Sequence, residues 1–362
     1  MSPYFIAFFI LSFWALVSLD QNYKSYVKLN LIFALFFIAV MAGFRSSYVG
    51  ADYESYKDIF YSFNGIFSGG LNQVLYGDYF FEPGFALLTV VISSFTSIHV
   101  VFLLVISLLT SLFMYFTISR LSLFPLLSLL VFFSYDFFTN YMVAIRFGLA
   151  TALGLCVLLY LSEKRYKLAF GFIFVAMSIH TAAIGLFLPF LLSIIRFQRI
   201  YILFMVFMAL IVGYIGLGSI IFNTIMPSWI PRANSAEFYL TDLKYGNSLG
   251  YLGYINVKYL ILSILLYVFW DQLEKKVKHF KLIVIFLVSA MVIRVGFHDL
   301  GFISGRVSAL LGIAEVMIVP ALFLLLIKNK LLAFWGIILY AAIHLSFMLF
   351  VRGFSDYSTI FS

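Results

Sequence analysis

The sequence predicts an all-α fold, a polytopic membrane bundle of about 12 transmembrane helices. Hydrophobic residues make up 64% of the 362 residues and charged residues only 10%, whereas soluble domains carry about 25% charged residues. Apolar runs of roughly 20 residues recur along the chain, which suits membrane helices and not the short alternating strands of a barrel. One bundle uses all of these runs, so we expect residues 1–362 to form a single membrane domain.

Short basic loops between the apolar runs set the expected orientation. Cytoplasmic loops of membrane proteins are enriched in Lys and Arg, and assigning six such loops to the cytoplasm places both chain ends outside. Topology then explains the net charge of +8, and no nucleic-acid partner is expected. The basic residues of these loops are Lys24 and Lys28; Arg120; Lys164, Arg165 and Lys167; Arg196 and Arg199; Lys275, Lys276, Lys278 and Lys281; Lys328 and Lys330.

The expected spans follow from this orientation. The first apolar run has no basic segment before it and is followed at once by another, so we interpret it as a retained span and not as a signal peptide. Segment 83–118 fits a tilted helix preceded by a re-entrant or interfacial piece, and 167–195 fits a hairpin that turns at "SIHTAA". The other expected spans are 3–19, 28–44, 124–140, 143–161, 200–222, 256–271, 280–296, 305–327 and 331–351.

Two sizeable loops are expected on the outer face, at 45–82 and 223–255. The first opens within "GFRSSYVGADYESYKDIF", which gathers Arg45, Asp52 and other charges between two apolar runs. It ends in "GDYFFEPGF", which contains Glu82. Topology does not account for these charges, so we expect the functional site on this face. The many tyrosines of the two loops fit either an interfacial aromatic belt or stacking on sugar rings.

Further candidates lie near or within the apolar runs. Arg146 is just inside a span, where an Arg either snorkels to the interface or lines a cavity and grips an anion. His180, at the turn of the hairpin, is either a polar cap or a functional group. Arg306 opens a late span, after the outward turn that contains Asp299.

Other polar positions within the spans are interpreted as structural. Glu315 and His344 lie mid-span, where each needs a partner, and we expect them to bond to each other or to a neighbouring helix. Cys156, the single cysteine, lies in an apolar run and is expected to pack there.

Motifs for metals and nucleotides are not found. The sequence contains no HExxH, CxxC or DxD pattern and no P-loop, GxSxG or GxGxxG, so no metal or cofactor is expected. Arginines without a metal suit a phosphate or diphosphate, because the guanidinium offers planar, bidentate donors. A carboxylate within hydrogen-bond reach of a hydroxyl can act as its general base.

These residues resemble the signature of the EpsG-like group of Wzy-type polysaccharide polymerases. The first element is an Arg-x4-Gly-x-Asp-x3-Tyr pattern, carried here by Arg45, Gly50, Asp52 and Tyr56. Four later elements follow in the same order, and the resemblance covers about residues 30–320. These elements are Glu82 in "FFEPGFALL", Arg146 in "NYMVAIRFGLATALGL", His180 in "AMSIHTAAI" and Arg306 in "ISGRVSALL".

The resemblance implies a GT-C-like glycosyltransferase of the bacterial cytoplasmic membrane, with its active site on the periplasmic or outer face. Such enzymes join O-antigen or capsule repeat units carried on undecaprenyl diphosphate. The growing chain is the donor, a hydroxyl of the next lipid-linked unit attacks it, and undecaprenyl diphosphate leaves. The implied partners are this donor, this acceptor, membrane lipid and a chain-length regulator protein.

Roles for the matched residues follow from this reaction. Negative charge grows on the diphosphate as its bond to the sugar breaks, and positioned arginines stabilise that charge. The general base is left open between two carboxylates, with a histidine as alternative base or orienting group. The expected diphosphate ligands are Arg146, Arg306 and Arg45; the expected catalytic residues are Asp52, Glu82 and His180; the expected saccharide contacts are Gly50, Tyr56 and Asp299.

Three other classes of membrane protein fit the residues less well. A lipid-linked oligosaccharide flippase would place its charges near the midplane, between two related halves. An O-antigen ligase uses the same donor and also depends on outer Arg and His residues, but the Arg-x4-Gly-x-Asp pattern favours a polymerase. A membrane O-acyltransferase would show a mid-membrane His beside Asn or Asp, a setting that His180 lacks.

Overall fold

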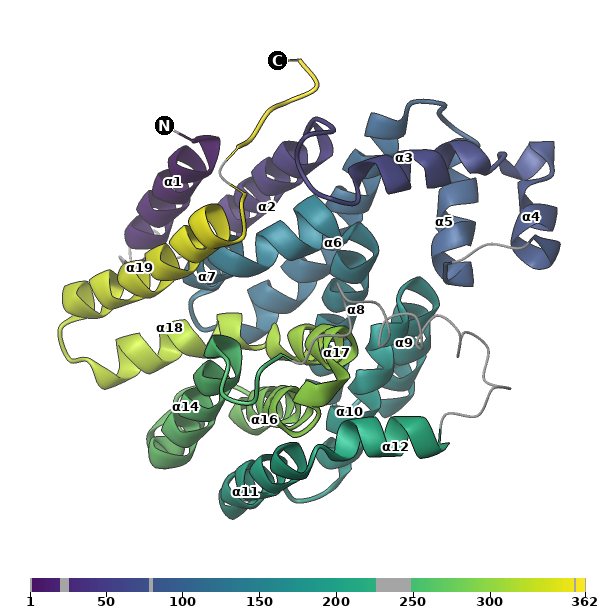
Figure 1. Ribbon diagram of the computed structural model, residues 1–362. Coiled ribbons are helices and arrows are strands. Elements are labelled where there is room, and N and C mark those ends of the chain that lie inside the picture. The colour runs from purple at the N-terminus through teal and green to yellow at the C-terminus, as the bar shows by residue number, and fades with distance from the viewer. Residues whose placement is uncertain (1, 20–25, 78–80, 226–248, 355, 362) are drawn as a thin grey trace. The chain divides into compact units, whose positions relative to one another are not determined.

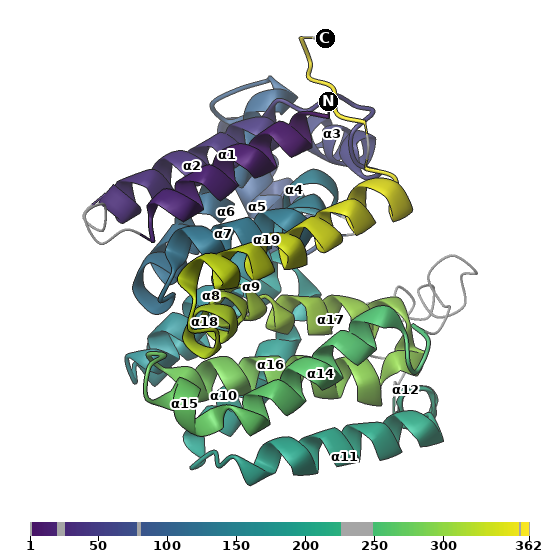
Figure 2. The ribbon, with the colours of Figure 1, turned by 90° about the vertical axis from the view of Figure 1, so that its left-hand side faces the viewer.

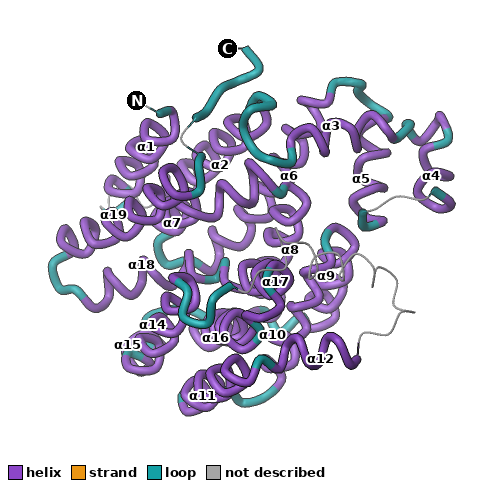
Figure 3. The backbone as a smooth tube through the Cα atoms, in the orientation of Figure 1, coloured by secondary structure: helices purple, strands orange, loops and turns teal. Residues whose placement is uncertain are grey.

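The computed structural model describes residues 2–19, 26–77, 81–225, 249–354 and 356–361 (Figure 1). Helices account for most of these residues (Figure 3), and extended pairing within them is limited to one isolated bridge between Arg45 and Thr359. The predicted all-α class is therefore confirmed. Most of the second expected outer loop, at 226–248, lies outside the described residues.

The chain divides into two compact units, which are described separately. Unit 1 comprises residues 1–160, 167–181 and 316–362, and unit 2 comprises residues 161–166 and 182–315. Helices that begin or end at a boundary are given below with the unit that holds most of their residues.

Unit 1 contains long apolar helices packed around α7. Helices α1 and α19 both pack against α7, and α2 packs along α6 (Figure 2). Proline opens α1, α5 and α7, where its missing N–H costs no helical hydrogen bond. The helices of this unit are α1 (Pro3–Val17), α2 (Val27–Gly43), α3 (Tyr53–Ser62), η2 (Ile66–Ser68), α4 (Gly70–Tyr76), α5 (Pro83–Ser93), α6 (His99–Leu121), α7 (Pro125–Phe137), the π-helix η3 (Phe138–Val143), α8 (Ile145–Ser162), α9 (Tyr166–Ile179), α18 (Glu315–Leu326), α19 (Lys330–Ser346) and the π-helix η6 (Phe347–Val351).

Unit 2 is centred on α16, which packs against α10, α11, α14 and α17. Helix α16 is buried on nearly all sides, which explains why its sequence shows no polar face. The helices of this unit are η4 (Thr181–Leu186), α10 (Phe187–Ile194), α11 (Ile200–Ile215), α12 (Leu217–Ile225), α14 (Tyr254–Val268), α15 (Trp270–Glu274), α16 (Phe280–Gly296), η5 (His298–Leu300) and α17 (Phe302–Gly312).

The helix boundaries agree with the expected spans in part. Segment 83–118 is divided into α5 and α6, and α9 gives way to η4 within "SIHTAA", while the hairpin expected there stays a prediction. Four of the described helical stretches are long and apolar enough to cross a membrane, and α17 with α18 makes a fifth if the pair is one broken span. Shorter apolar helices, such as α1, α2 and α11, account for most of the other expected spans. A polytopic helical bundle fits, and the count of about 12 stays a prediction.

Candidate active site

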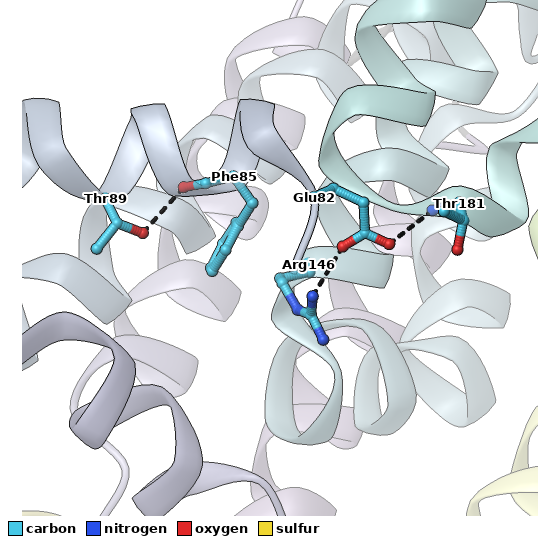
Figure 4. Close-up of polar contacts among 5 residues, drawn as sticks. All are labelled: Glu82, Phe85, Thr89, Arg146 and Thr181. Carbon is cyan, nitrogen blue, oxygen red and sulfur yellow. Dashed lines mark hydrogen bonds and ion pairs between the residues drawn. The ribbon is translucent and has the colours of Figure 1, made fainter. Parts of the chain in front are cut away.

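Glu82 is the N-cap residue of α5. Its own backbone is extended, and it is followed by Pro83, the first residue of the helix. Its side chain makes no capping bond to its own helix and instead reaches toward α8 and the end of α9 (Figure 4). The approach of α5 to α9 is close, because a Cβ on Gly84 would overlap with Oγ of Ser178. Gly84 therefore allows the Glu82 carboxylate to reach Arg146 and Thr181, which follow it in the sequence by 64 and 99 residues.

Arg146 forms an ion pair with Glu82. Its Nη1 lies 2.8 Å from Oε2 of Glu82, and the side chains are 22% and 8% exposed. Arg146 is the second residue of α8, directly after the π-helix η3. The N-terminus of a helix disfavours cations and favours anions, so Glu82 supplies the charge that this position favours. About a fifth of the Arg146 side chain remains exposed, although its Nε is buried.

The second oxygen of Glu82 is also engaged. Oε1 accepts a hydrogen bond from the backbone N–H of Thr181, at 2.9 Å (Figure 4). Burial raises the pKa of Glu82, but the charges of Arg146 and His180 and the Thr181 amide lower it, and the pKa of this carboxyl lies below its usual range. The ring of His180 packs edge-on against Phe147, with centroids 5.4 Å apart. The structure thus brings together three of the predicted residues: Glu82, Arg146 and His180.

Aromatic rings surround the guanidinium of Arg146. Its Cζ lies 5.6 Å from the ring centre of Phe85 and 5.7 Å from that of Phe81. Tyr56 is buried and packs against Phe85, with centroids 6.1 Å apart. Through the rings of Tyr56 and Phe85 the predicted motif at 45–56 is connected to Arg146. Apolar walls lower the local dielectric and strengthen the charge interactions between them.

Gly50 fixes the motif loop to the segment that precedes Arg146. Its φ is +96°, and a Cβ at this position would overlap with the carbonyl oxygen of Met142 in η3. Only glycine fits both the backbone conformation and the contact. Asp52 follows at the N-cap position of α3, half-buried, and its side chain makes no capping bond.

Arg45, the first residue of the motif, is fully buried where α2 ends. Its Nη1 donates to the carbonyl oxygen of Ala42 at 2.6 Å, and its Cζ lies 5.7 Å from the ring centre of Tyr53.

The remaining predicted residues belong to unit 2. The guanidinium of Arg306, on α17, lies over the ring of Phe302, with Cζ 4.7 Å from its centre. Asp299 accepts a hydrogen bond from the backbone N–H of Ser219 at 2.7 Å, so its carboxylate lies at the start of α12, where a negative charge is favoured.

Glu315 has a partner on a neighbouring helix, which is one of the two expected alternatives, but the partner residue was not predicted. Its Oε2 lies 2.7 Å from Nζ of Lys258, and both side chains are largely buried. Lys258 stands within the apolar run "YINVKYLIL", and an isolated Lys in such a run was the available signal. His344 packs against the rings of Tyr135 and Tyr340. Within the described parts of the chain, no three His, Cys, Asp or Glu residues are close enough to hold a metal ion.

Comparison with known proteins identifies relatives of the chain. The sequence model of the EpsG family matches residues 28–361. The chain is 26% identical to the amylovoran biosynthesis protein AmsC of Erwinia amylovora over 329 residues, which is 89% of this chain and 86% of that protein. No solved structure matches.

Proposed function

Because the chain belongs to the EpsG family, we propose that it is a polysaccharide polymerase that extends a lipid-linked glycan at a membrane surface. The name of the relative from Erwinia amylovora refers to the biosynthesis of a polysaccharide, amylovoran, and the match covers most of both chains. In the proposed reaction the growing glycan leaves undecaprenyl diphosphate and is transferred to the next lipid-linked repeat unit. The site faces the outside of the bacterial cytoplasmic membrane, and a chain-length regulator is a proposed partner.

The arrangement of Arg146 is the observation that carries this proposal. A buried carboxylate orients its guanidinium, two aromatic rings lie against it, and part of the side chain remains exposed. A donor fixed before the reaction stabilises the charge that develops on a departing diphosphate without reorganisation. An exposed, freely rotating Arg would have to lose side-chain entropy on each turnover. Arg306 is proposed as a second diphosphate ligand.

The bonds in the proposed step balance without a further reactant. A hydroxyl oxygen of the acceptor sugar forms a bond to the anomeric carbon of the donor. The bond from that carbon to the diphosphate oxygen breaks, and undecaprenyl diphosphate leaves with the electron pair. The hydroxyl proton moves to a protein base.

Asp52 is our choice for this base. Both oxygens of Glu82 already accept hydrogen bonds, and the pKa of Glu82 is lowered, which makes it a weaker base. Glu82 is therefore proposed to position Arg146. Asp52 is half-buried in the loop held by Gly50, and His180 stays the alternative base. We assign the saccharide contacts to the loop around Gly50 and to Asp299. Tyr56 is buried, and its proposed role is to support the ring of Phe85, which lies against Arg146.

Deletion of the gene in its own host tests the proposal. We expect the surface polysaccharide to lose its ladder on a gel while single-repeat material remains. Loss of the single-repeat material as well would indicate a flippase or a ligase, and an unchanged ladder would refute the assignment.

Complementation with Arg146→Lys then tests the diphosphate role. Lys keeps the charge but not the bidentate geometry, and loss of one such donor lowers turnover about 100-fold or more. Arg165→Lys is the matched control, since Arg165 forms an exposed pair with Glu163. Full polymer length with Arg146→Lys would contradict the role, whereas Arg165→Lys should behave as wild type.

A further inference from the structure

The segment at 356–361, which we call the C-terminal strap, lies across the connection between α2 and α3. Figure 1 shows this part of the chain, in yellow, running past the end of α2. Ser46 N–H donates to the carbonyl of Ser358 at 2.9 Å, Ile360 N–H donates to the carbonyl of Phe44 at 3.1 Å, and the hydroxyls of Ser46 and Ser358 are in contact. Thr359 forms an antiparallel bridge with Arg45.

Arg45 lies beneath this strap with donors unused. Its side chain is 0% exposed, and Nη1 donates to Ala42. Nε and Nη2 have no hydrogen-bond partner among the described residues. A buried charged donor left without an acceptor is costly, so such a group is rare unless a further molecule binds it.

Tyr4, which packs against Tyr357 of the strap, adds a third unused donor. Its side chain is also 0% exposed, and its hydroxyl has no hydrogen-bond partner within the described chain. Tyr4 and Arg45 lie near enough for each to influence the pKa of the other, and the ring of Tyr4 lies 5.3 Å from that of Tyr357 in the strap. The ionisable groups that act on Arg45 are Tyr4, Tyr53, Tyr56 and Tyr357, which are uncharged at neutral pH.

The geometry of the guanidinium defines what fits. Nε–H and Nη2–H lie side by side on one edge of the planar group and point the same way, which matches two oxygens of a carboxylate or phosphate. A single buried water accepts at most two hydrogen bonds, fewer than these three donors offer. A tetrahedral oxyanion can accept from both Arg45 donors and from the hydroxyl of Tyr4.

We propose that Arg45 and Tyr4 form a binding site for a phosphate-class oxyanion and that the C-terminal strap is its removable cover. The strap is suited to leave, since its residues are half-buried or exposed and Phe361 is 79% exposed. Two backbone hydrogen bonds, the contact between the serine hydroxyls and a bond from the Tyr357 hydroxyl to the carbonyl of Met41 hold it, and none of its residues is fully buried, which is typical of segments that open locally. That the oxyanion is the diphosphate of the lipid-linked substrate rests on the proposed function; the binding itself does not.

A reversible lock on the strap tests the cover. Ser46→Cys and Ser358→Cys, in a Cys156→Ala background, place two thiols where the serine hydroxyls touch. Oxidation then ties the strap down and dithiothreitol releases it. The purified protein in neutral detergent is titrated calorimetrically with inorganic diphosphate in both states. We expect binding to the reduced protein and at least a tenfold weaker affinity for the oxidised protein.

Two variants test the site beneath the strap. Arg45→Gln in the reduced protein should abolish binding, and Tyr4→Phe should weaken it while leaving the packing of the ring intact. Equal affinity in the oxidised and reduced states would show that the strap is not a cover. No binding to the reduced protein, which elutes as a single species, would refute the oxyanion site.

The same locked protein separates the possible sources of the oxyanion. Saturation by phosphatidylglycerol in mixed micelles, with no response to diphosphate, would assign the site to a lipid headgroup and refute the link to substrate. Polymerisation in membranes that stops on oxidation and resumes with dithiothreitol would support that link. If diphosphate binding follows the lock but polymerisation does not, the site stands and its place in the reaction is wrong.

Discussion

At the scale of single residues, the centre of the candidate site is the carboxylate of Glu82, which connects its own segment with two segments distant in the sequence. Glu82 accepts from the side chain of Arg146 and from the backbone of Thr181, and it lies within the field of His180. Glu82, Arg146 and His180 were predicted as candidates because each is polar next to an apolar run, whereas Thr181 was not. The pairing of Glu82 with Arg146 was not predicted either, since 64 residues separate the two and no local pattern encodes such a contact.

Neutralising Glu82 should change the dependence of stability on pH. Folding lowers the pKa of this carboxyl, so its contribution is present above the unfolded value of about 4.3 and is lost as pH falls through the folded value. At neutral pH we expect Glu82→Gln to cost about 3 kcal/mol, because it leaves a largely buried Arg146 without its counter-charge. Below about pH 4 the difference from wild type should shrink. Thermal unfolding in detergent, followed from neutral to acidic pH, measures both effects.

Glu54→Gln is the control for this experiment. Glu54 pairs with Lys57 in an exposed position, with 57% of its side chain accessible, and exposed pairs contribute little. Its stability should follow that of wild type at each pH. If the stability of Glu82→Gln differed from that of wild type by the same amount at every pH, the assigned linkage would be wrong.

At the scale of elements, the contact of the motif loop with η3 fixes where Asp52 lies relative to the start of α8. The sequence shows a glycine in the motif, but it does not show every reason why a glycine is required there. The motif alone predicts a tight turn, whereas the structure adds a backbone contact with Met142, in a segment far along the chain. The pairing of Lys258 with Glu315 was not predicted, because one polar residue hardly alters the hydropathy of its helix.

Gly50→Ala should therefore be strongly destabilising. The left-handed backbone costs an alanine about 1 kcal/mol and the overlap with Met142 adds about 1–3 kcal/mol. Gly69→Ala separates the two effects, because Gly69 has φ +91° but nothing within 4 Å of the point where its Cβ would lie. Thermal unfolding should show a small loss for Gly69→Ala and a much larger one for Gly50→Ala. Equal losses would mean that the contact with Met142 does not constrain the loop.

At the scale of the whole molecule, the fold class followed from hydropathy alone, because a bilayer requires every spanning backbone to satisfy its own hydrogen bonds. The two irregular segments were also predicted, since the basic loops left too few residues for regular spans at 83–118 and 167–195. The number of crossings depends on whether the bilayer thins around helices such as α1 and α11, which are shorter than a straight span. The number of crossings is therefore determined by the response of the lipid as well as by the sequence.

The orientation can be measured directly. In a Cys156→Ala background, Ser68→Cys in the first outer loop should react with a membrane-impermeant maleimide in intact cells. Lys276→Cys, in a basic loop, should react only after the membrane is permeabilised, because Lys-rich loops stay in the cytoplasm. Labelling of both positions in intact cells, or the reverse order, would overturn the assigned topology.

The contact between Ser46 and Ser358 joins residues 312 positions apart. Translation proceeds at about 5–20 residues per second, so Arg45 is synthesised roughly 15 to 60 seconds before the strap. Throughout that interval nothing from the strap covers Arg45. The covering of Arg45 therefore follows its synthesis by that interval, and a ribosome that stalls before residue 358 leaves a chain whose Arg45 lacks this cover.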